Sequence, residues 1–174
     1  MKFQLISLLA LLPSALAQSD PNPILTALGT ITSDTTSLNT TVANFDGDPL
    51  NLIKITIQSA ELLCAINKGT DTANKAANLT FDQTLAIATA TLALATDVNQ
   101  TITTIINTKP QFDRLLVVDP VILLNLKLEQ DATRKFSAAV VAKVPEALQS
   151  VAKGLTQGID DSFAEGIAVY EHFL

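Results

Sequence analysis

The chain has 174 residues, of which 48% are hydrophobic, 17 are acidic and 11 are lysine or arginine, so its formal net charge is −6. This length suits a single domain with its own hydrophobic core, and the negative charge excludes nucleic acid and anionic membrane surfaces as expected partners. With Cys64 as its one cysteine, the chain cannot form an intramolecular disulfide.

The first 17 residues are predicted to be a cleaved secretory signal peptide. Lys2 precedes an apolar run over residues 5–12, and the small residues of a cleavage site follow at Ala15-Leu16-Ala17. The alternative, a transmembrane anchor, is disfavoured because the run is shorter than the ~20 residues that span a bilayer. Residues 18–174 would then be the mature domain, and the loss of Lys2 would change the net charge from −6 to −7.

The C-terminal segment, residues 168–174, carries Glu171 and His172 where a lipid-anchor signal would need a hydrophobic tail. We therefore expect a secreted, extracellular protein with no transmembrane segment and no lipid anchor.

The first amphipathic helix is predicted to begin at Asn22-Pro23, which has the cap-plus-proline pattern of a helix start, and to end near Phe45-Asp46-Gly47. Thr35 falls in the gap of its apolar stripe. The stripe recurs at steps of three and four residues and consists of Ile24, Leu28, Ile31, Leu38, Val42 and Phe45.

Residues 48–69 are predicted to form the central helix of the domain. Asp48 and Pro49 suit its first positions, and Gly69 suits a left-handed stop. Apolar side chains cover roughly two thirds of its helical wheel, more than one partner helix can cover. On this wheel Cys64 lies among apolar neighbours, so we expect a buried, unreactive thiol.

Three further helices are predicted after a polar loop over residues 70–78. Thr80 and Gln83 form a capping-box pattern for a third helix, to about Asn107. Pro110 is expected to break the pattern, and residues 112–118 form an apolar connector. The apolar half of the third helix carries Leu85, Ile87, Leu92, Leu94, Val98, Ile102, Ile105 and Ile106.

Asp119-Pro120 restarts a fourth helix, which should run to about Val144, and Pro145 begins or kinks a fifth that should reach about Phe173. With no alternating strand pattern, the sequence predicts an all-α fold, a single-domain bundle of about five amphipathic helices. The apolar face of the fifth helix carries Leu148, Val151, Leu155, Ile159, Phe163 and Tyr170.

Residues that could carry chemistry are few. The single histidine, His172, lies near the chain end, where it cannot form a nucleophilic site with a buried Cys64. Asp46-Gly47-Asp48 is too short for a calcium loop, and Asp160 and Asp161 lie on a solvated face, without the burial that carboxylate catalysis needs. We therefore expect no enzyme, no metal and no cofactor.

Asn-x-Thr sequences predict three candidate glycosylation sites in a secreted protein. Asn78 lies in the predicted loop, and Asn39 lies at the edge of the polar side of the first helix. Asn99 falls in the apolar half of the third helix, where a glycan would oppose packing, so we predict that it is unmodified.

Small polar residues interrupt the apolar faces, and two interpretations are open. Their hydroxyls can bond back to the preceding turn of their own helix, or they can line an internal cavity that holds the head group of an amphiphile. The scarcity of aromatic residues leaves little bulk to fill the space between five helices, which favours a cavity. The candidate cavity residues are Thr56, Ser59, Asn67, Asn99, Thr133 and Ser137, with the apolar residues Ile53, Ile57, Leu63, Leu92, Leu126, Phe136, Val140, Leu155 and Phe163.

Short patterns spread over the mature chain are together typical of one protein family. They are Asp46-Gly47-Asp48, Lys109-Pro110-Gln111-Phe112, Leu123 and Leu126 followed by Thr133, Phe136 and Ser137, then Lys143-Val144-Pro145, and the segment from Phe163 to Tyr170. In these patterns the chain resembles the fungal hydrophobic surface-binding protein A family, which includes cell-wall galactomannoprotein antigens.

The resemblance implies an all-helical, secreted, non-enzymatic fungal protein. Family members adsorb to hydrophobic surfaces and help to recruit lytic enzymes, which implies hydrophobic solid surfaces and secreted hydrolases as partners. Related galactomannoprotein domains bind long-chain fatty acids inside the bundle. The wall antigens carry a Ser/Thr-rich stalk and a lipid-anchor signal, and we find neither in this sequence, so we expect a freely secreted form.

Our first hypothesis is therefore a secreted protein that binds a fatty acid or a similar amphiphile in the bundle interior. The second is an interfacial protein that opens its bundle and spreads its apolar helix faces onto a hydrophobic solid or wax. The alternative is a structural cell-wall galactomannoprotein antigen, which the missing anchor disfavours.

Overall fold

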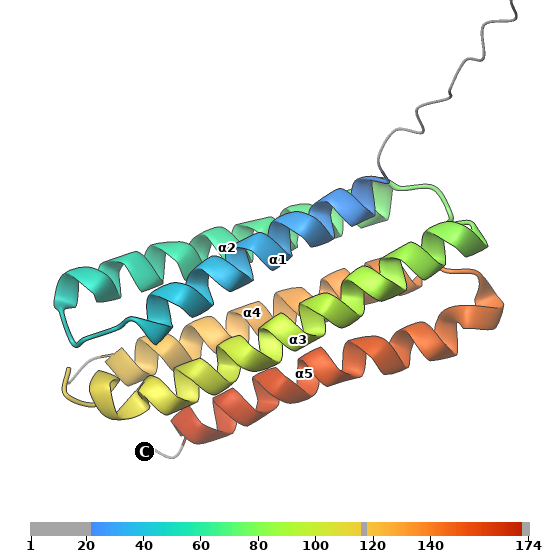
Figure 1. The fold of residues 1–174 in the computed structure, drawn as a ribbon. Helices are drawn as coiled ribbons and strands as arrows, with labels where there is room; N and C mark the ends of the chain where they lie inside the picture. Colours follow the sequence, from blue (N-terminus) through green and yellow to red (C-terminus); the bar gives the residue numbers. More distant parts are fainter. Residues whose placement is uncertain (1–21, 116–117, 172–174) are drawn as a thin grey trace, which may run out of the picture.

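A computed structural model describes residues 22–115 and 118–171, and the predicted signal peptide lies outside these residues. All regular secondary structure in the described ranges is helical, which confirms the predicted all-α bundle (Figure 1). The elements are α1 (Pro23–Ala43), α2 (Pro49–Lys75), α3 (Phe81–Phe112), α4 (Val118–Val141), the short 3₁₀ helix η1 (Glu146–Leu148) and α5 (Gln149–Glu171).

The five helices form a closed ring around a shared interior. Following the ring, α1 packs against α2, α2 against α4, α4 against α5, α5 against α3, and α3 again against α1. In Figure 1, α1, α3 and α5 run in one direction and α2 and α4 in the other. Each helix has two principal neighbours, so no helix is central.

The prediction that the second helix is central and largely buried is wrong. Only one face of α2 points inward, and Leu50, Ile53 and Ile57 are 71%, 56% and 53% exposed. Cys64 is exposed as well, which contradicts the expected buried thiol. A ring position buries a single stripe of a helix, and the remaining apolar side chains of α2 lie on the molecular surface.

By length and composition, α2 could also cross a membrane, although only 22% of its most apolar window is buried. Exposed apolar side chains such as Leu50, Ile53 and Ile57 contribute to the high hydropathy of α2. The core helix of a soluble protein can meet the same criterion of length and hydropathy, so the expectation of no transmembrane segment stays a prediction.

Gly69 does not stop α2, which continues to Lys75 through the segment predicted as a loop. Gly69 is buried where α2 crosses α4 and α1. A Cβ atom at this position would lie 3.1 Å from Cε2 of Phe136 and 3.3 Å from Cδ1 of Ile31. The glycine therefore serves close helix packing, which outweighs its cost of about 1 kcal/mol inside a helix.

The ends of the other helices follow the predicted signals more closely. Asn22 and Asp48 each accept a backbone hydrogen bond as N-caps, and Thr80 and Gln83 form the predicted capping box. α3 nevertheless continues through Pro110 to Phe112, and α4 ends at Val141 rather than near Val144. Proline near the end of a helix removes only one of the last hydrogen bonds, so α3 tolerates it there.

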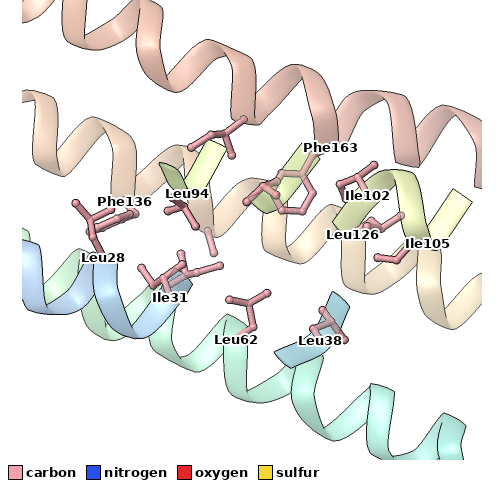
Figure 2. Packing of buried hydrophobic residues seen from close by; sticks show 14 of the residues in the cluster. Leu28, Ile31, Leu38, Leu62, Leu94, Ile102, Ile105, Leu126, Phe136 and Phe163 are labelled. Carbon is pink, nitrogen blue, oxygen red and sulfur yellow. The ribbon is translucent and has the colours of Figure 1, made fainter. Parts of the chain in front are cut away.

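Side chains from all five helices meet along the axis of the ring (Figure 2). All six residues of the predicted apolar stripe of α1 are buried. The buried faces of α3 and α5 are narrower than predicted. Leu85 and Leu92 of α3 and Val151 of α5 are 61%, 52% and 63% exposed.

One end of the ring is closed by aromatic and charged contacts. The rings of Phe45 and Phe112 lie 4.7 Å apart, and the ammonium of Lys109 lies 4.9 Å from the centre of the Tyr170 ring. Lys109 also pairs with Asp113 and Asp119, at 2.6 Å and 2.7 Å. These contacts join the end of α3 to the residues that follow α1, to the first turn of α4 and to the last turn of α5.

Candidate functional site

The interior of the ring contains a cavity of about 40 Å³ that is lined by residues of all five helices. Most of the lining is aliphatic or aromatic, and Figure 2 shows Leu62, Phe136 and Phe163 directed toward it from three helices. A cavity needs about 10–15 Å³ for each water that it holds, so this one accommodates only a few waters. An alkyl chain could enter only if the helices moved apart.

Four of the lining hydroxyls are bonded to their own helices, among them that of Thr156, which donates to the carbonyl of Lys153 at 3.0 Å. Thr35 donates to the carbonyl of Ile31 at 2.8 Å, and Thr91 donates to that of Ile87 at 2.8 Å. Thr101 donates to the carbonyl of Asp97 at 2.7 Å. For these residues the first interpretation, bonding back to the preceding turn, is correct.

A line of polar side chains on α4 behaves differently. Glu129, Thr133 and Ser137 follow one another at steps of four residues and all border the cavity. Within the described parts of the chain, the hydroxyls of Thr133 and Ser137 have no hydrogen-bond partner. They are therefore free to bond a ligand.

Glu129 is the charged member of this line and is 4% exposed. Its Oε1 accepts a hydrogen bond from the hydroxyl of Ser59 at 2.6 Å. Burial raises the pKa of Glu129 from its ordinary 4.5 to about 7, against the lowering effect of that hydrogen bond. Glu129 and Ser59 also border a second cavity, of about 30 Å³, between α1, α2, α3 and α4.

An apolar groove of about 160 Å³ lies at the end of the ring opposite Lys109. It is formed by the first turns of α3, the end of α4, η1 and the first turns of α5. Phe81, Leu85 and Val151 are exposed beside it, and Thr91, Val140 and Thr156 line both the groove and the interior cavity. The groove is therefore the candidate entrance for an apolar chain.

A polar groove of about 600 Å³ follows the outside of the ring between α4 and α5. Thr133, Ser137 and Thr156 line both this groove and the interior cavity. Arg134 and Asp160 form an ion pair in it, at 2.5 Å. Both grooves border the first half of α5, in which no side chain before Ile159 is fully buried.

The structure brings part of the predicted site together. Thr133, Ser137, Phe136, Val140 and Phe163 line the interior cavity, Ser59 and Leu126 line the second cavity, Leu155 lines the apolar groove, and Leu63 packs half-buried against the core.

Other candidates lie on the outside, and their predicted interior position is wrong. Ile53, Ile57 and Leu92 are more than half exposed, Asn67 is exposed, and Thr56 is exposed with its hydroxyl bonded to the carbonyl of Leu52 at 3.0 Å. The buried face of α2 contains Ile55, Ser59 and Leu62, so Ile53, Thr56 and Ile57 lie on its outer side.

Sequence reasoning missed Glu129, along with four lining threonines. A signal was present, because Glu129 precedes Thr133 and Ser137 by one and two turns on the apolar side of α4. The missed lining residues are Thr35, Thr91, Thr101, Thr156 and Glu129.

The candidate glycosylation sites differ in their surroundings. Asn78 is exposed in the short connection between α2 and α3, and Asn39 is half-buried on α1. Asn99 is also exposed, with its amide donating to the Ser162 hydroxyl at 3.3 Å, so its predicted position in an apolar face is wrong. Its expected lack of a glycan stays a prediction.

The chain matches the model of a family described as hydrophobic surface binding protein A over residues 21–142. It is 29% identical to cell wall mannoprotein 1 of Aspergillus flavus over 179 residues, which cover 98% of this chain and 63% of the relative. It is 28% identical to cell wall mannoprotein 1 of Aspergillus fumigatus, over 86% of this chain and 51% of the relative. The chain thus spans between half and two thirds of these relatives.

Solved structures share the same fold. The crystal structure of Afmp4p in complex with palmitic acid has a TM-score of 0.81 and 27% identity, covering 84% of this chain and 97% of Afmp4p. Ligand binding domain 2 of the Penicillium marneffei MP1 protein, complexed with arachidonic acids, has a TM-score of 0.81 and 19% identity. The match covers 88% of this chain and 97% of that domain. The predicted resemblance and the predicted fold class are both confirmed by these matches.

Proposed function

The chain belongs to the hydrophobic surface binding protein A family, and from this membership and its interior cavity we propose that it binds a long-chain fatty acid or a similar amphiphile between its helices. We further propose that residues 1–17 are a cleaved signal peptide and that residues 18–174 form a secreted, non-enzymatic lipid-binding domain. The observation that carries this proposal is the apolar cavity lined by all five helices, with a polar line on α4.

The similarity to Afmp4p supports this proposal, because that protein was crystallised with palmitic acid. The cavity in this chain holds only about 40 Å³, so a sixteen-carbon ligand requires the ring to open. Burying methylenes contributes about 0.8 kcal/mol each, so ten of them contribute roughly 8 kcal/mol before ordering costs. That gain is large enough to offset the loss of a few helix contacts.

The first half of α5 is the part of the ring that we expect to move. Its side chains Val151, Ala152 and Leu155 are exposed or half-buried, whereas Phe163 and Tyr170 in the second half are buried. Few buried contacts are lost when such a segment separates from its neighbours. The apolar groove beside it provides a path from the surface to the cavity.

Titration of delipidated protein with a fluorescent fatty acid tests the proposal, and we expect saturable binding. Ser137→Phe should weaken binding about tenfold or more, because a larger side chain would occupy the space of the cavity. Ala164→Phe, at an exposed position of α5, is the matched control and should bind as the unmodified protein does. Absence of saturable binding at micromolar ligand would contradict the proposal.

A second function, adsorption to hydrophobic solid surfaces, is favoured by an exposed apolar stripe on α2. Leu50, Ile53, Ile57 and Cys64 lie at helical spacing on the outer side of this helix. Such a stripe can contact a solid surface without unfolding the ring. Secreted hydrolases as partners remain a prediction of the family resemblance alone.

Retention on phenyl resin at rising salt concentration measures this adsorption. The variant Ile53→Ser/Ile57→Ser should be retained less, because it removes two exposed apolar side chains, and should still bind fatty acid. Equal retention of both proteins would contradict a role for the stripe.

A structural cell-wall role is the alternative, since the relatives are cell wall mannoproteins. Glycan occupancy at Asn78 and Asn39 and covalent retention in the wall would favour it over a freely secreted form.

A further inference from the structure

Glu129 differs from every other residue that lines the interior. Among the residues that border the two interior cavities, it alone is titratable. The side chains that border a cavity together with Glu129 include Leu38 of α1, Ser59 of α2, Ile105 of α3 and Phe163 of α5, with Thr133 one turn further along α4. No positive charge reaches either cavity from these five helices.

The hydrogen bonding of Glu129 is incomplete. Ser59 donates to Oε1, whereas Oε2 has no hydrogen-bond partner anywhere in residues 22–115 and 118–171. Because Glu129 borders both interior cavities, a carboxylate oxygen without a protein donor can accept a hydrogen bond from a bound ligand. The nearby cation on the outer side, Arg134, is paired with Asp160 and lies in the polar groove.

We propose that Glu129 selects the head group of the ligand, so that the interior favours amphiphiles whose head donates a hydrogen bond, such as long-chain alcohols, and accepts a fatty-acid carboxylate only together with a proton. This inference rests on the proposed function, because it concerns ligands of the same interior. It adds the preferred chemical class of ligand and the dependence of binding on pH.

The reason is the interaction of like charges in a water-poor space. Two ionised carboxylates in one cavity repel each other, and a single shared proton converts the repulsion into a hydrogen bond. A fatty acid that binds while both carboxyls are ionised therefore takes up one proton from solution. The hydroxyl of an alcohol donates directly to the ionised Glu129, so no proton is taken up.

The pKa of Glu129 determines the pH range in which the binding of a fatty acid requires an added proton. Because burial raises the pKa of Glu129 to about 7, its carboxyl is largely protonated below that pH and ionised above it. Uptake of one proton changes an affinity by tenfold for each pH unit. The affinity for a fatty acid should therefore fall about tenfold per unit above about pH 7, while that for an alcohol should stay level.

Displacement of Nile red by dodecanoic acid and by 1-dodecanol, from about pH 5 to about pH 9, tests the inference. The two ligands share the same alkyl chain and differ only in the head group. In the unmodified protein we expect the acid to lose affinity above about pH 7 and the alcohol to keep it. In Glu129→Gln the loss should disappear, because the charge is removed while the shape is kept.

Glu165→Gln removes an exposed carboxylate of α5 and should behave as the unmodified protein does. If Glu129→Gln fails to fold, calorimetric titration of the unmodified protein in two buffers of different ionisation enthalpy measures the proton uptake directly. Equal pH profiles for acid and alcohol, or no proton uptake on binding the acid, would overturn the inference alone. Binding of neither ligand would overturn the proposed function as well.

Discussion

Glu129 should make the folding stability of this protein depend on pH even without a ligand. It is an acid whose pKa is raised by burial from 4.5 in the ordinary case to about 7 in the fold. Between these values the folded state holds a proton that the unfolded state has released, so stability falls as the pH rises through this range. Each pKa unit corresponds to 1.36 kcal/mol, so the loss amounts to about 3 kcal/mol.

Urea denaturation followed by circular dichroism at about pH 5 and about pH 8 measures this loss. The variant Glu129→Gln should lose far less stability over the same interval, because glutamine has no proton to release. The new amide also leaves donors without partners, at a cost of about 1–3 kcal/mol at every pH, so the comparison uses the change with pH and not the absolute value.

Other carboxyls contribute equally to both proteins, and Asp119, whose pKa is raised by burial, is one of them. Their contribution cancels when the stability change between the two pH values in Glu129→Gln is subtracted from that in the unmodified protein. Glu165→Gln, at an exposed position, serves as the control and should retain the full change. An equal loss in the unmodified protein and in Glu129→Gln would refute the account of Glu129 as a buried, uncompensated acid.

Gly158→Ala should raise the free energy of unfolding by about 1 kcal/mol, because a Cβ there meets nothing within 4 Å and alanine favours the helix. Gly166→Ala should lower it by about 1–3 kcal/mol, because its Cβ would lie 3.0 Å from Cγ2 of Ile102; urea denaturation of the pair checks both signs, and a stabilising Gly166→Ala would contradict the packing. In protein secreted from a fungal host, peptide mapping should find a glycan at the exposed Asn78, and occupancy of Asn99 would show that its bond to a neighbouring helix is dispensable.

The fold was predictable where local signals agree with one another. The stripe of α1, from Ile24 to Phe45, has a single apolar face, so its periodicity identified the buried side correctly. The capping box at Thr80 and Gln83 depends on residues three apart in sequence, and it formed as predicted. Such features are set by the helix itself and need no knowledge of its neighbours.

The orientation of α2 could not be found in this way. With Ile53, Ile55 and Ile57 at successive odd positions, apolar residues cover most of its circumference, and no face is distinguished from the others. Neighbouring helices decide which of these side chains is covered, and they cover Ile55 alone. The local preferences of Gly69 and Pro110 likewise predict helix ends, but packing overrides them and both helices continue past these residues.

The candidate site was predictable in part for the same reason. Thr133 and Ser137 are uncharged and interrupt an apolar face, a pattern that indicated an interior position. Glu129 belongs to the same line of residues on α4. Because a charged residue on a helix is normally exposed, the sequence alone predicts that Glu129 lies at the surface. Only the ring arrangement places Ser59 opposite it and leaves its carboxyl between two cavities.

The ring arrangement also explains why one chain can combine two apolar functions. A helix in a ring of five buries one stripe toward the axis, so apolar residues beyond that stripe must lie outside. On α2 the inner stripe contains Ile55, Leu62 and Ile66, and the outer stripe contains Ile53 and Ile57. The two stripes share no side chain, so substitutions on the outer one should change adsorption to surfaces and leave lipid binding intact. A single loss of both activities in Ile53→Ser/Ile57→Ser would instead mean that adsorption requires the interior to open.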